Sequence, residues 1–244
     1  MALQVSQVRV VILAGGQGTR VRHLLPDLPK PMAPACGRPF VEWVVRFLAK
    51  QGCRRFAVST GYKAESIERH FAASPVPGVE IACVAEPEPL GTAGGVRHVL
   101  RMLDAREEAF LVSNGDSLLV ADLRPALAAL ESGCDGVIIG RPMADASRYG
   151  TLRLGDGGRL LEFEEKRPGA GVINSGLYVL ARRVIEAFPN RSPLSLEREV
   201  FPALVAAGYD FRVPVAEGPF LDIGTEADLK LADAFIAANK DSFL

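Results

Sequence analysis

Short apolar runs alternate with longer amphipathic stretches through the first half of the chain. Apolar runs of strand length predict buried strands at 10–13, 56–60, 79–85 and 110–113. Apolar residues at helical spacing predict helices at 40–52, 63–73, 91–103 and 122–131. Because strands that alternate with helices form right-handed β-α-β crossovers, this half predicts a largely parallel sheet flanked by helices.

The pattern changes after Gly140. Strands are predicted at 151–154, 159–164 and 172–180, joined by turns such as the one at 155–158. A helix at 194–207, a strand at 211–215 and an amphipathic helix at 225–238 follow. This part predicts a smaller mixed or antiparallel region that forms the second wall of a cleft. The expected fold class is α/β, with a Rossmann-like, mostly parallel sheet in one domain over 1–244.

Three glycines, Gly15, Gly16 and Gly18, follow the first predicted strand. Glycine lets the backbone turn sharply and lets its N–H groups approach a ligand without a Cβ in the way. Consecutive N–H groups in such a turn make a nest for anions. Arg20 carries a guanidinium that suits phosphate oxygens, and Lys30 lies between two prolines that stiffen its backbone. The stretch therefore predicts a phosphate-binding loop.

Two common phosphate-binding motifs do not fit this loop. A Walker loop requires G-x-x-x-x-G-K-[ST], which the sequence lacks. A dinucleotide fingerprint would place its third glycine at Val21 and an acidic residue near 36–38, where the chain has Cys-Gly-Arg.

The loop and the segment around Lys30 carry a family resemblance. The sequences LAGGQGTR at 13–20 and PKPM at 29–32 resemble the signature of sugar-1-phosphate nucleotidyltransferases, and further matches run to about residue 228. Enzymes of this family join a nucleoside triphosphate to a sugar 1-phosphate and release pyrophosphate. The resemblance implies a nucleotide-binding part at about 1–140, a sugar-phosphate-binding part at about 141–224 and a closing helix at about 225–244.

Composition and charge narrow the partners and the location. The chain of 244 residues is 48% hydrophobic, which suits one globular domain with a sizeable core. Its net charge of −1 gives no basic field for nucleic acid or a membrane surface. The sequence shows no signal-peptide pattern, no apolar run long enough to span a membrane and no C-x-x-C pair among its four cysteines. We therefore expect a cytoplasmic protein with reduced thiols, and a homo-oligomer remains open.

Two aspartates follow short apolar runs at predicted strand ends. Asp116 comes shortly after the run at 110–113, and Asp222 comes directly after Phe220 and Leu221. A carboxylate in such a position can hold a hard divalent cation over triphosphate oxygens. The resemblance implies that these two aspartates jointly ligate Mg²⁺, the cofactor that we expect.

The resemblance also implies three catalytic residues, Arg20, Lys30 and Asp116. Arg20 and the glycine nest would hold the β- and γ-phosphates. Lys30 would stabilise charge at the α-phosphorus while the sugar phosphate oxygen attacks. Such a displacement needs charge neutralisation and in-line positioning more than proton transfer, so no side chain has to act as the nucleophile.

The segment that begins at Glu86 resembles the part of the family that recognises the base. A carboxylate only accepts hydrogen bonds. Guanine offers it two donors, whereas uracil and thymine offer one donor between two acceptors, so Glu86 favours GTP. Relatives that use uracil or thymine tend to have glutamine at this position. The expected nucleotide-binding residues are Leu13, Ala14, Gly15, Gly16, Gly18, Thr19, Glu86, Leu90, Gly91, Thr92 and Ala93.

Several later residues fall where the family binds its sugar phosphate. Lys166 would take the phosphate group. Glu165 and Asn174 would hydrogen-bond hydroxyl groups, and Gly150 would leave room for the sugar ring. The expected sugar-phosphate-binding residues are Asn114, Gly150, Glu165, Lys166 and Asn174.

Within the family, the chain most resembles guanylyltransferases that act on D-glycero-D-manno-heptose 1-phosphate. The compact length and the sequences PKPMAP at 29–34, GYK at 61–63 and EPLGT at 88–92 carry this likeness. It implies that GTP and this sugar phosphate give GDP-heptose for bacterial surface polysaccharide, in a capsule or lipopolysaccharide. A mannose-1-phosphate guanylyltransferase and a uridylyltransferase for another sugar are the alternatives.

Two other classes of protein fit parts of the pattern. A non-catalytic regulator that binds nucleotide sugars would not need the catalytic cations and both aspartates together. A metal-dependent glycosyltransferase usually shows D-x-D, whereas Asp116 is followed by Ser117 and Leu118. The sequence therefore favours an enzyme that transfers a nucleotidyl group.

Overall fold

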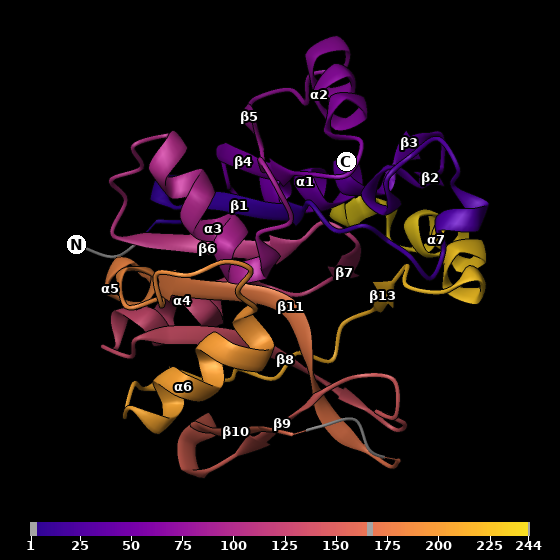
Figure 1. Cartoon of the computed structure of the whole chain (residues 1–244). Coiled ribbons are helices and arrows are strands. Elements are labelled where there is room, and N and C mark those ends of the chain that lie inside the picture. The colour runs from indigo at the N-terminus through magenta and orange to yellow at the C-terminus, as the bar shows by residue number, and fades with distance from the viewer. Residues whose placement is uncertain (1–3, 165–167, 244) are drawn as a thin grey trace.

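A nine-stranded mixed sheet runs through the computed structural model, which describes residues 4–164 and 168–243 (Figure 1). Four strands form its parallel half in the order β5-β4-β1-β6. They are β1 (Arg9–Ala14), β4 (Arg55–Thr60), β5 (Glu80–Ala85) and β6 (Ala109–Asn114). These strands agree with the four predicted ones to within a residue at each end, so the prediction of a parallel sheet is confirmed.

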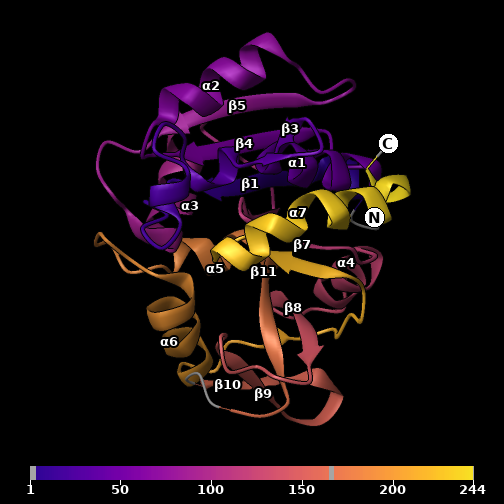
Figure 2. The same ribbon diagram turned by 90° about the vertical axis from the view of Figure 1, so that its right-hand side faces the viewer.

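Strand β1 is buried on both faces, which explains its apolar sequence from Val10 to Ala14. Val10 and Ile12 point into one core and Val11 into the other, because successive side chains of a strand point to opposite faces. The first core is covered by α1 (Phe40–Lys50), α2 (Ala64–Ala73), α4 (Arg124–Glu131) and α7 (Glu226–Ala238). The second core is covered by α3 (Gly91–Met102), α5 (Arg182–Glu186) and α6 (Phe201–Ala206), on the opposite side of the sheet (Figure 2).

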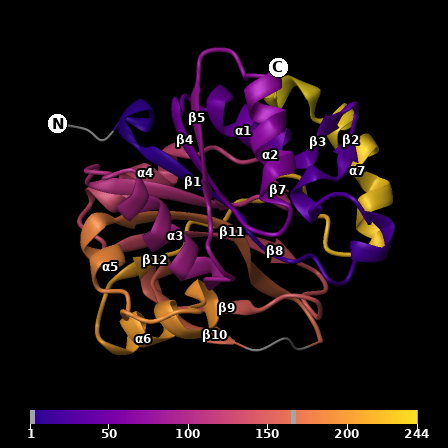
Figure 3. The ribbon, with the colours of Figure 1, turned by 45° about the horizontal axis from the view of Figure 1, so that its top comes forward.

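The later strands extend the same sheet in a mostly antiparallel half, in which only β12 pairs parallel, with β8, among the described strands. Strand β11 (Gly171–Ala181) pairs antiparallel with β6 and joins the two halves (Figure 3). The remaining strands of this half are β8 (Gly136–Met143), β9 (Thr151–Leu154), β10 (Leu160–Glu164) and β12 (Phe211–Arg212). Strands β8 and β9 pair antiparallel with β11, and β10 pairs antiparallel with β9. The predicted mixed or antiparallel region is therefore present.

Strand β8 is an element that the sequence pattern does not predict. Two glycines, Gly136 and Gly140, interrupt its apolar run, and glycine weakens a strand signal. A Cβ at Gly136 would lie 2.5 Å from the ring of Phe211 on β12. A Cβ at Gly140 would lie 2.6 Å from the side chain of Val172 on β11. The two glycines thus allow close packing against neighbouring strands, but they shorten the apolar run by which a strand is predicted.

The predicted helix at 194–207 is confirmed to within two residues, as a π-helical turn at Leu196–Val200 followed directly by α6. It begins after Ser195, which is extended and whose hydroxyl oxygen accepts the N–H of Arg198 as a cap. Another prediction is wrong in its extent. The predicted strand at 211–215 is reduced to β12 and a single bridge at Val215. Pro214 lacks the N–H that a continuous ladder requires.

The order of the parallel strands reverses at β1. From β1 the chain moves to β4 and β5 on one side and then returns to β6 on the other. In such sheets a crevice opens outside the carboxyl ends of the strands where the order reverses. Leu13 and Asn114 are neighbours in register at that edge. Within the two described ranges, no helix is both long and apolar enough to cross a bilayer.

Candidate active site

A cleft of about 410 Å³ opens where the order of the strands reverses. Its walls come from the glycine loop after β1, the segment around Lys30, and the segments that follow β5, β6 and β13 (Phe220–Asp222). The lining residues are Leu13, Ala14, Gly15, Gly16, Gln17, Gly18, Thr19, Arg20, Val21, Lys30, Pro31, Glu86, Pro89, Gly91, Thr92, Asn114, Asp116 and Gly224.

Close packing requires two glycines of the loop. Gly18 has a φ of +57°, and a Cβ there would lie 2.9 Å from the Cβ of Lys30. A Cβ at Gly15 would lie 2.5 Å from a carboxylate oxygen of Glu86. Because glycine has no side chain, the loop passes closely over both Lys30 and Glu86 and holds them beside the cleft.

The sequence GYK at 61–63 braces the segment that follows the loop. The guanidinium carbon of Arg22 lies 4.3 Å from the centroid of the Tyr62 ring, and its Nε donates to the Tyr62 hydroxyl at 3.1 Å. The Nζ of Lys63 donates to the carbonyl oxygen of Pro26 at 2.5 Å. These contacts tie the segment between Arg20 and Lys30 to the end of β4.

Lys30 and Asp116 form an ion pair in the cleft. Their side chains are 11% and 25% exposed, so the pair is partly shielded from water. Shielding lowers the local dielectric and strengthens the attraction relative to an exposed surface pair. The structure therefore brings the predicted catalytic lysine into contact with a predicted metal ligand.

A short antiparallel ribbon brings Asp222 beside Asp116. In this ribbon β13 pairs with β7 (Ser117–Leu119), and Asp222 is the register partner of Ser117. The N–H of Ile223 donates to the carbonyl oxygen of Asp116 at 3.0 Å. Two aspartates that are far apart in the sequence thus lie at the same end of the ribbon.

The electrostatic surroundings of Asp222 indicate whether Asp116 and Asp222 together suit a cation. Burial raises the pKa of Asp222, the negative charge of Asp116 raises it further, and Lys30 and Arg20 only partly oppose both effects. Two carboxylates that repel each other form a donor set that fits a hard divalent ion with oxygen ligands. No cluster of three or more His, Cys, Asp or Glu side chains suited to a metal occurs in the part of the chain that the structure describes. Phosphate oxygens and water would therefore have to supply the remaining ligands.

Gly224 lets Arg20 approach the aspartate pair. A Cβ at Gly224 would collide with the carboxylate of Asp222 and would lie 3.2 Å from the guanidinium of Arg20. Arg20 lines the cleft and is exposed. Its guanidinium therefore faces the space in which phosphate groups would lie.

Glu86 is held in place by two hydrogen-bond donors. The hydroxyl of Ser59 donates to its Oε1 at 2.8 Å, and the N–H of Leu90 donates to its Oε2 at 3.0 Å. A Cβ at Gly95 would lie 2.9 Å from Oε1, so helix α3 also packs closely against the carboxylate. Each carboxylate oxygen has two acceptor sites, and the described residues leave one on each unused.

The predicted sugar-side residues fall partly in the cleft. Asn114 lines it, and its amide packs against Gly176, which has a φ of +80°. The N–H of Asn174 donates to the carbonyl oxygen of Gly150 at 3.5 Å, but neither residue lines the cleft as described. Glu165 and Lys166 lie outside the described residues.

Tyr149 connects the sugar side to the start of α7. Its ring meets that of Phe220 edge to face with centroids 6.0 Å apart, and the guanidinium carbon of Arg148 lies 5.5 Å from its centroid. Arg148 also forms an ion pair with Asp228 in the first turn of α7. Burial raises the pKa of the Tyr149 hydroxyl, and the charge of Asp222 raises it further.

Two predicted nucleotide-binding residues do not line the cleft as described. Leu90 is 8% exposed and Ala93 is 0% exposed. The N–H of Leu90 holds Glu86, and the N–H of Ala93 donates to the carbonyl oxygen of Leu194 at 2.9 Å. Both residues therefore support the walls of the cleft through backbone hydrogen bonds, and their contacts with a ligand stay predictions.

The lining also contains residues that sequence reasoning missed. They are Gln17, Val21, Pro31, Pro89 and Gly224. Gln17 and Pro31 lie inside the two signature sequences, Val21 follows the first, and Pro89 lies in the base-recognition segment, so their positions were a usable signal. Gly224 follows Asp222 closely, but only the ribbon of β7 and β13 shows that it reaches the cleft.

Comparison with known proteins places this chain in a family. The model of the family described as "Nucleotidyl transferase" matches residues 9–239. The D-glycero-alpha-D-manno-heptose 1-phosphate guanylyltransferase of Aneurinibacillus thermoaerophilus is 34% identical over 229 residues, which are 92% of this chain and 96% of that protein. The mannose-1-phosphate guanylyltransferase of Mycobacterium tuberculosis is 38% identical over 205 residues, which are 83% of this chain but only 56% of that protein.

A solved structure is similar along nearly the whole chain. It is described as HddC from Yersinia pseudotuberculosis complexed with GMP-PN. The TM-score is 0.80 at 33% sequence identity, and the match covers 92% of this chain and 97% of that one.

Proposed function

Because the chain belongs to the nucleotidyl transferase family, we propose that it joins GTP to D-glycero-D-manno-heptose 1-phosphate to give GDP-heptose and pyrophosphate. The observation that carries this proposal is the likeness to a heptose 1-phosphate guanylyltransferase that covers nearly the whole of both chains. The cleft supports the proposal because it contains the groups that this reaction needs. Arg20 and Lys30 can bind phosphate oxygens, Asp116 can bind a cation, and the carboxylate of Glu86 can accept hydrogen bonds from a base.

The reaction exchanges one bond at the α-phosphorus for another. An oxygen of the sugar phosphate attacks the α-phosphorus of GTP, and the bond to the bridging oxygen of pyrophosphate breaks. The glycine loop and Arg20 hold the β- and γ-phosphates, so the leaving group stays in line with the attack. Lys30 neutralises negative charge that increases on the α-phosphate oxygens in the transition state.

A divalent cation, which we take to be Mg²⁺, would be held by Asp116 and Asp222. When bound, it would neutralise charge on the phosphate oxygens and on the leaving pyrophosphate. Without such a charge, the two carboxylates would repel the triphosphate that Arg20 and Lys30 attract.

Glu86 supports the choice of guanine. Ser59 and Leu90 each occupy one acceptor site of its carboxylate, and the free sites are suited to N1–H and the 2-amino group of guanine. Uracil would place carbonyl oxygens where the carboxylate needs donors. An acceptor left unpaired in this way costs on the order of 1–3 kcal/mol.

The sugar phosphate would lie between Asn114 and the start of β9. Asn174 and Glu165 would bind its hydroxyl groups, Lys166 its phosphate group, and Gly150 would leave room for the ring. We propose that the reaction takes place in the cytoplasm and supplies GDP-heptose for a capsule or lipopolysaccharide.

A mannose-1-phosphate guanylyltransferase is the second candidate, favoured by the higher identity to the Mycobacterium tuberculosis protein over a shorter match. The test is pyrophosphate release with GTP, ATP, CTP, UTP and TTP, each combined with the 1-phosphates of the heptose, mannose and glucose. We expect the highest kcat/KM for GTP with the heptose 1-phosphate. A preference for mannose 1-phosphate would select the second candidate, and no release with any pair would overturn both.

A further inference from the structure

We propose that Glu197 is a positioning residue that fixes the orientation of the Asn174 side-chain amide through the hydroxyl of Tyr178. This inference rests on the proposed function, because Asn174 is one of the residues expected to bind the sugar. Glu197 lies on the π-helical turn at Leu196–Val200. Such turns are rare and occur frequently at functional sites.

A chain of hydrogen bonds joins the three side chains. The Nδ2 of Asn174 donates to the hydroxyl oxygen of Tyr178 at 2.8 Å. The same hydroxyl donates to the Oε1 of Glu197 at 3.0 Å. At the other end of the amide, the Oδ1 of Asn174 accepts the backbone N–H of Gly176 at 3.0 Å.

The groups at the two ends of this chain of hydrogen bonds determine which partner donates in each bond. The carboxylate of Glu197 only accepts, so Tyr178 must donate its single proton to it. The hydroxyl oxygen of Tyr178 is then left to accept, and Asn174 must turn its NH₂ group toward it. The backbone N–H of Gly176 only donates, so the carbonyl of the same amide must face Gly176. The two requirements agree on one orientation of Asn174.

Tyr178 is suited to transmit this direction. Its side chain is 0% exposed, so water cannot replace either hydrogen-bond partner. Burial raises the pKa of its hydroxyl well above the ordinary value, and the charge of Glu197 raises it further. The hydroxyl therefore keeps its proton and remains both a donor and an acceptor.

The second oxygen of Glu197 ties the same carboxylate to the nucleotide side of the cleft. Its Oε2 accepts the hydroxyl of Thr92 at 3.0 Å and the hydroxyl of Ser195 at 2.9 Å. The hydroxyl oxygen of Thr92 accepts the N–H of Leu196 at 2.8 Å. The only hydroxyl proton of Thr92 is thus committed to Glu197. Thr92 would then meet a nucleotide with its backbone or methyl group and not as a hydroxyl donor.

Among the described residues, the network leaves Asn174 with one unused N–H and one unused acceptor site, each pointing in a fixed direction. A preorganised amide binds a hydroxyl group without first losing rotamer freedom. Since Asn174 is expected to bind the sugar, loss of its bond to Tyr178 should weaken binding of the sugar 1-phosphate and leave GTP nearly unaffected.

The test compares Michaelis constants for the two substrates. Glu197→Ala and Tyr178→Phe should each raise KM for the sugar 1-phosphate about tenfold, the effect of losing one hydrogen bond. In Tyr178→Phe, KM for GTP should change by less than about twofold. Glu197→Ala also releases the hydroxyl of Thr92 on the nucleotide side, so the two Michaelis constants are compared in Tyr178→Phe. Because both variants break the same chain, the double variant should lose no more than either single one. Glu197→Gln keeps a carbonyl acceptor for Tyr178 and should restore most of the loss.

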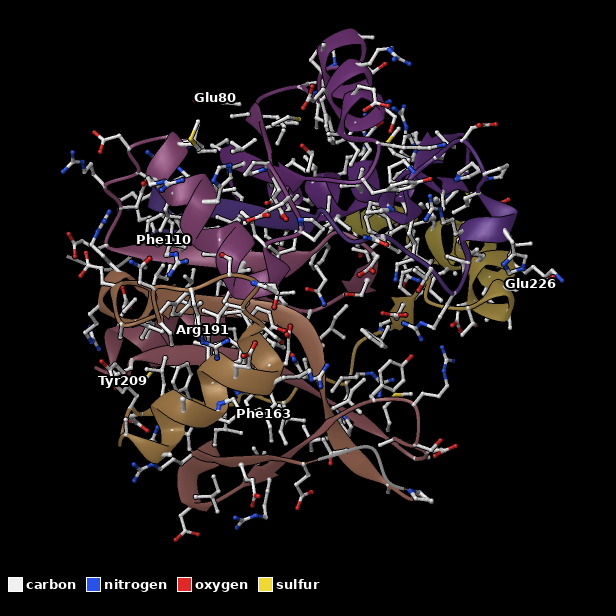
Figure 4. The ribbon with its side chains drawn as sticks, viewed as in Figure 1. Glu80, Phe110, Phe163, Arg191, Tyr209 and Glu226 are labelled. Atoms are coloured by element: carbon white, nitrogen blue, oxygen red, sulfur yellow. The ribbon has the colours of Figure 1, made fainter. Side chains whose placement is uncertain are left out.

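Two matched controls separate this role from damage to the fold. Glu199→Ala changes the same turn, where Glu199 binds Arg191 and the N–H of Ser195 but not Tyr178. Tyr209→Phe is the same substitution as Tyr178→Phe, beyond the end of α6 (Figure 4). Both controls should keep the KM of the wild-type protein for the sugar 1-phosphate.

A measurement that does not depend on turnover separates this inference from the proposed function. In the wild-type protein, one side-chain amide proton of Asn174 should exchange slowly with solvent in NMR spectra, and Tyr178→Phe should remove that protection. Fast exchange in the wild type, a normal sugar KM in Tyr178→Phe, or equal rises of both KM values in Tyr178→Phe would overturn the role of Glu197. Absence of any turnover in the wild type would overturn the proposed function and leave the exchange measurement decisive for Glu197.

Discussion

The ammonium group of Lys30 is ion-paired with the carboxylate of Asp116 inside the cleft. The residue expected to act at the α-phosphorus is therefore in contact with a residue expected to hold the metal. A divalent cation would compete with the lysine for Asp116, because its double charge attracts the carboxylate more strongly. We expect binding of metal and GTP to release Lys30 toward the phosphate oxygens.

Lys30→Ala should lower kcat by about 100-fold or more, the size of effect seen when a donor at developing charge is removed. KM for GTP should change little, because the contact is expected to strengthen in the transition state. Steady-state kinetics with the best sugar phosphate provide the measurement. Normal kcat with only a raised KM for GTP would show that Lys30 merely binds the nucleotide.

Asp116→Asn and Asp222→Asn should each abolish most turnover. Each variant removes one of the two negative charges that would hold the cation. The wild-type protein should also lose its activity in excess chelator and regain it on addition of Mg²⁺. Asp156→Asn, at an exposed position in the turn between β9 and β10, is the control and should retain activity. Full turnover in excess chelator would contradict a metal requirement.

Glu86→Gln should lower kcat/KM for GTP and narrow the ratio of GTP to UTP. Glutamine places a donor beside an acceptor, so it fits the edge of uracil better than the edge of guanine. The penalty of about 1–3 kcal/mol for an unpaired acceptor corresponds to roughly 5- to 150-fold in the ratio of kcat/KM for GTP to kcat/KM for UTP. Glu88→Gln, which changes an exposed carboxylate in the same segment, should leave the ratio as it is. A wild type that prefers UTP would remove Glu86 from base recognition.

Gly18→Ala should reduce kcat because its Cβ would displace Lys30. The matched control is Gly78→Ala. Both glycines have positive φ, +57° and +75°, so both substitutions carry a backbone penalty of about 1 kcal/mol. A Cβ at Gly78 meets nothing within 4 Å, so this variant should lose stability without losing kcat. Equal kcat in the two variants would show that the position of Lys30 does not depend on Gly18.

Glu42 should make stability depend on acid pH. It is 1% exposed, accepts hydrogen bonds of 2.7 Å from Arg38 and Arg46, and lies 2.8 Å from the Nε2 of His70. Burial alone raises its pKa, but the hydrogen bonds from Arg46, His70 and Arg38 outweigh burial, so the pKa is lowered from 4.5. A carboxyl group whose pKa is lower in the folded than in the unfolded state stabilises the fold at every pH above its unfolded pKa. This stabilisation is lost as the pH falls through the folded pKa.

Glu42→Gln should therefore lower the free energy of unfolding by about 1–3 kcal/mol at pH 7. The difference from the wild type should shrink as the pH falls below 4.5, the unfolded value. Urea unfolding at pH 7, 5 and 4 gives the measurement. Glu162→Gln removes a surface pair with Arg153 and should cost less than about 1 kcal/mol. A difference for Glu42→Gln that does not vary with pH would contradict the role of its charge.

The parallel half of the fold and the glycine loop follow from local sequence. Strand β1 is apolar from Val10 to Ala14 because both of its faces are buried, so its signal is strong. The loop after it has glycines where Lys30 and Glu86 approach, so its composition already reports the packing. These features depend on residues close to one another in the chain.

The rest of the site depends on contacts that no local pattern records. The juxtaposition of Asp222 and Asp116 comes from the register of β7 with β13, two strands of three residues each, which are too short for a period to be read. Strand β8 is not predicted because its two glycines, which allow close packing against neighbouring strands, weaken its apolar pattern. The role of Glu197 could not be seen either, since its partners Thr92 and Tyr178 come from other parts of the chain.

The ribbon of β7 and β13 also sets the order in which the proposed cation site is assembled during synthesis. Asp116 emerges from the ribosome long before Asp222, and the whole antiparallel half is made between them. A nascent chain can therefore form the parallel half and its glycine loop while the proposed cation site is still missing one carboxylate. If Asp116 and Asp222 hold the cation together, the site is completed only when β13 has left the ribosome and paired with β7.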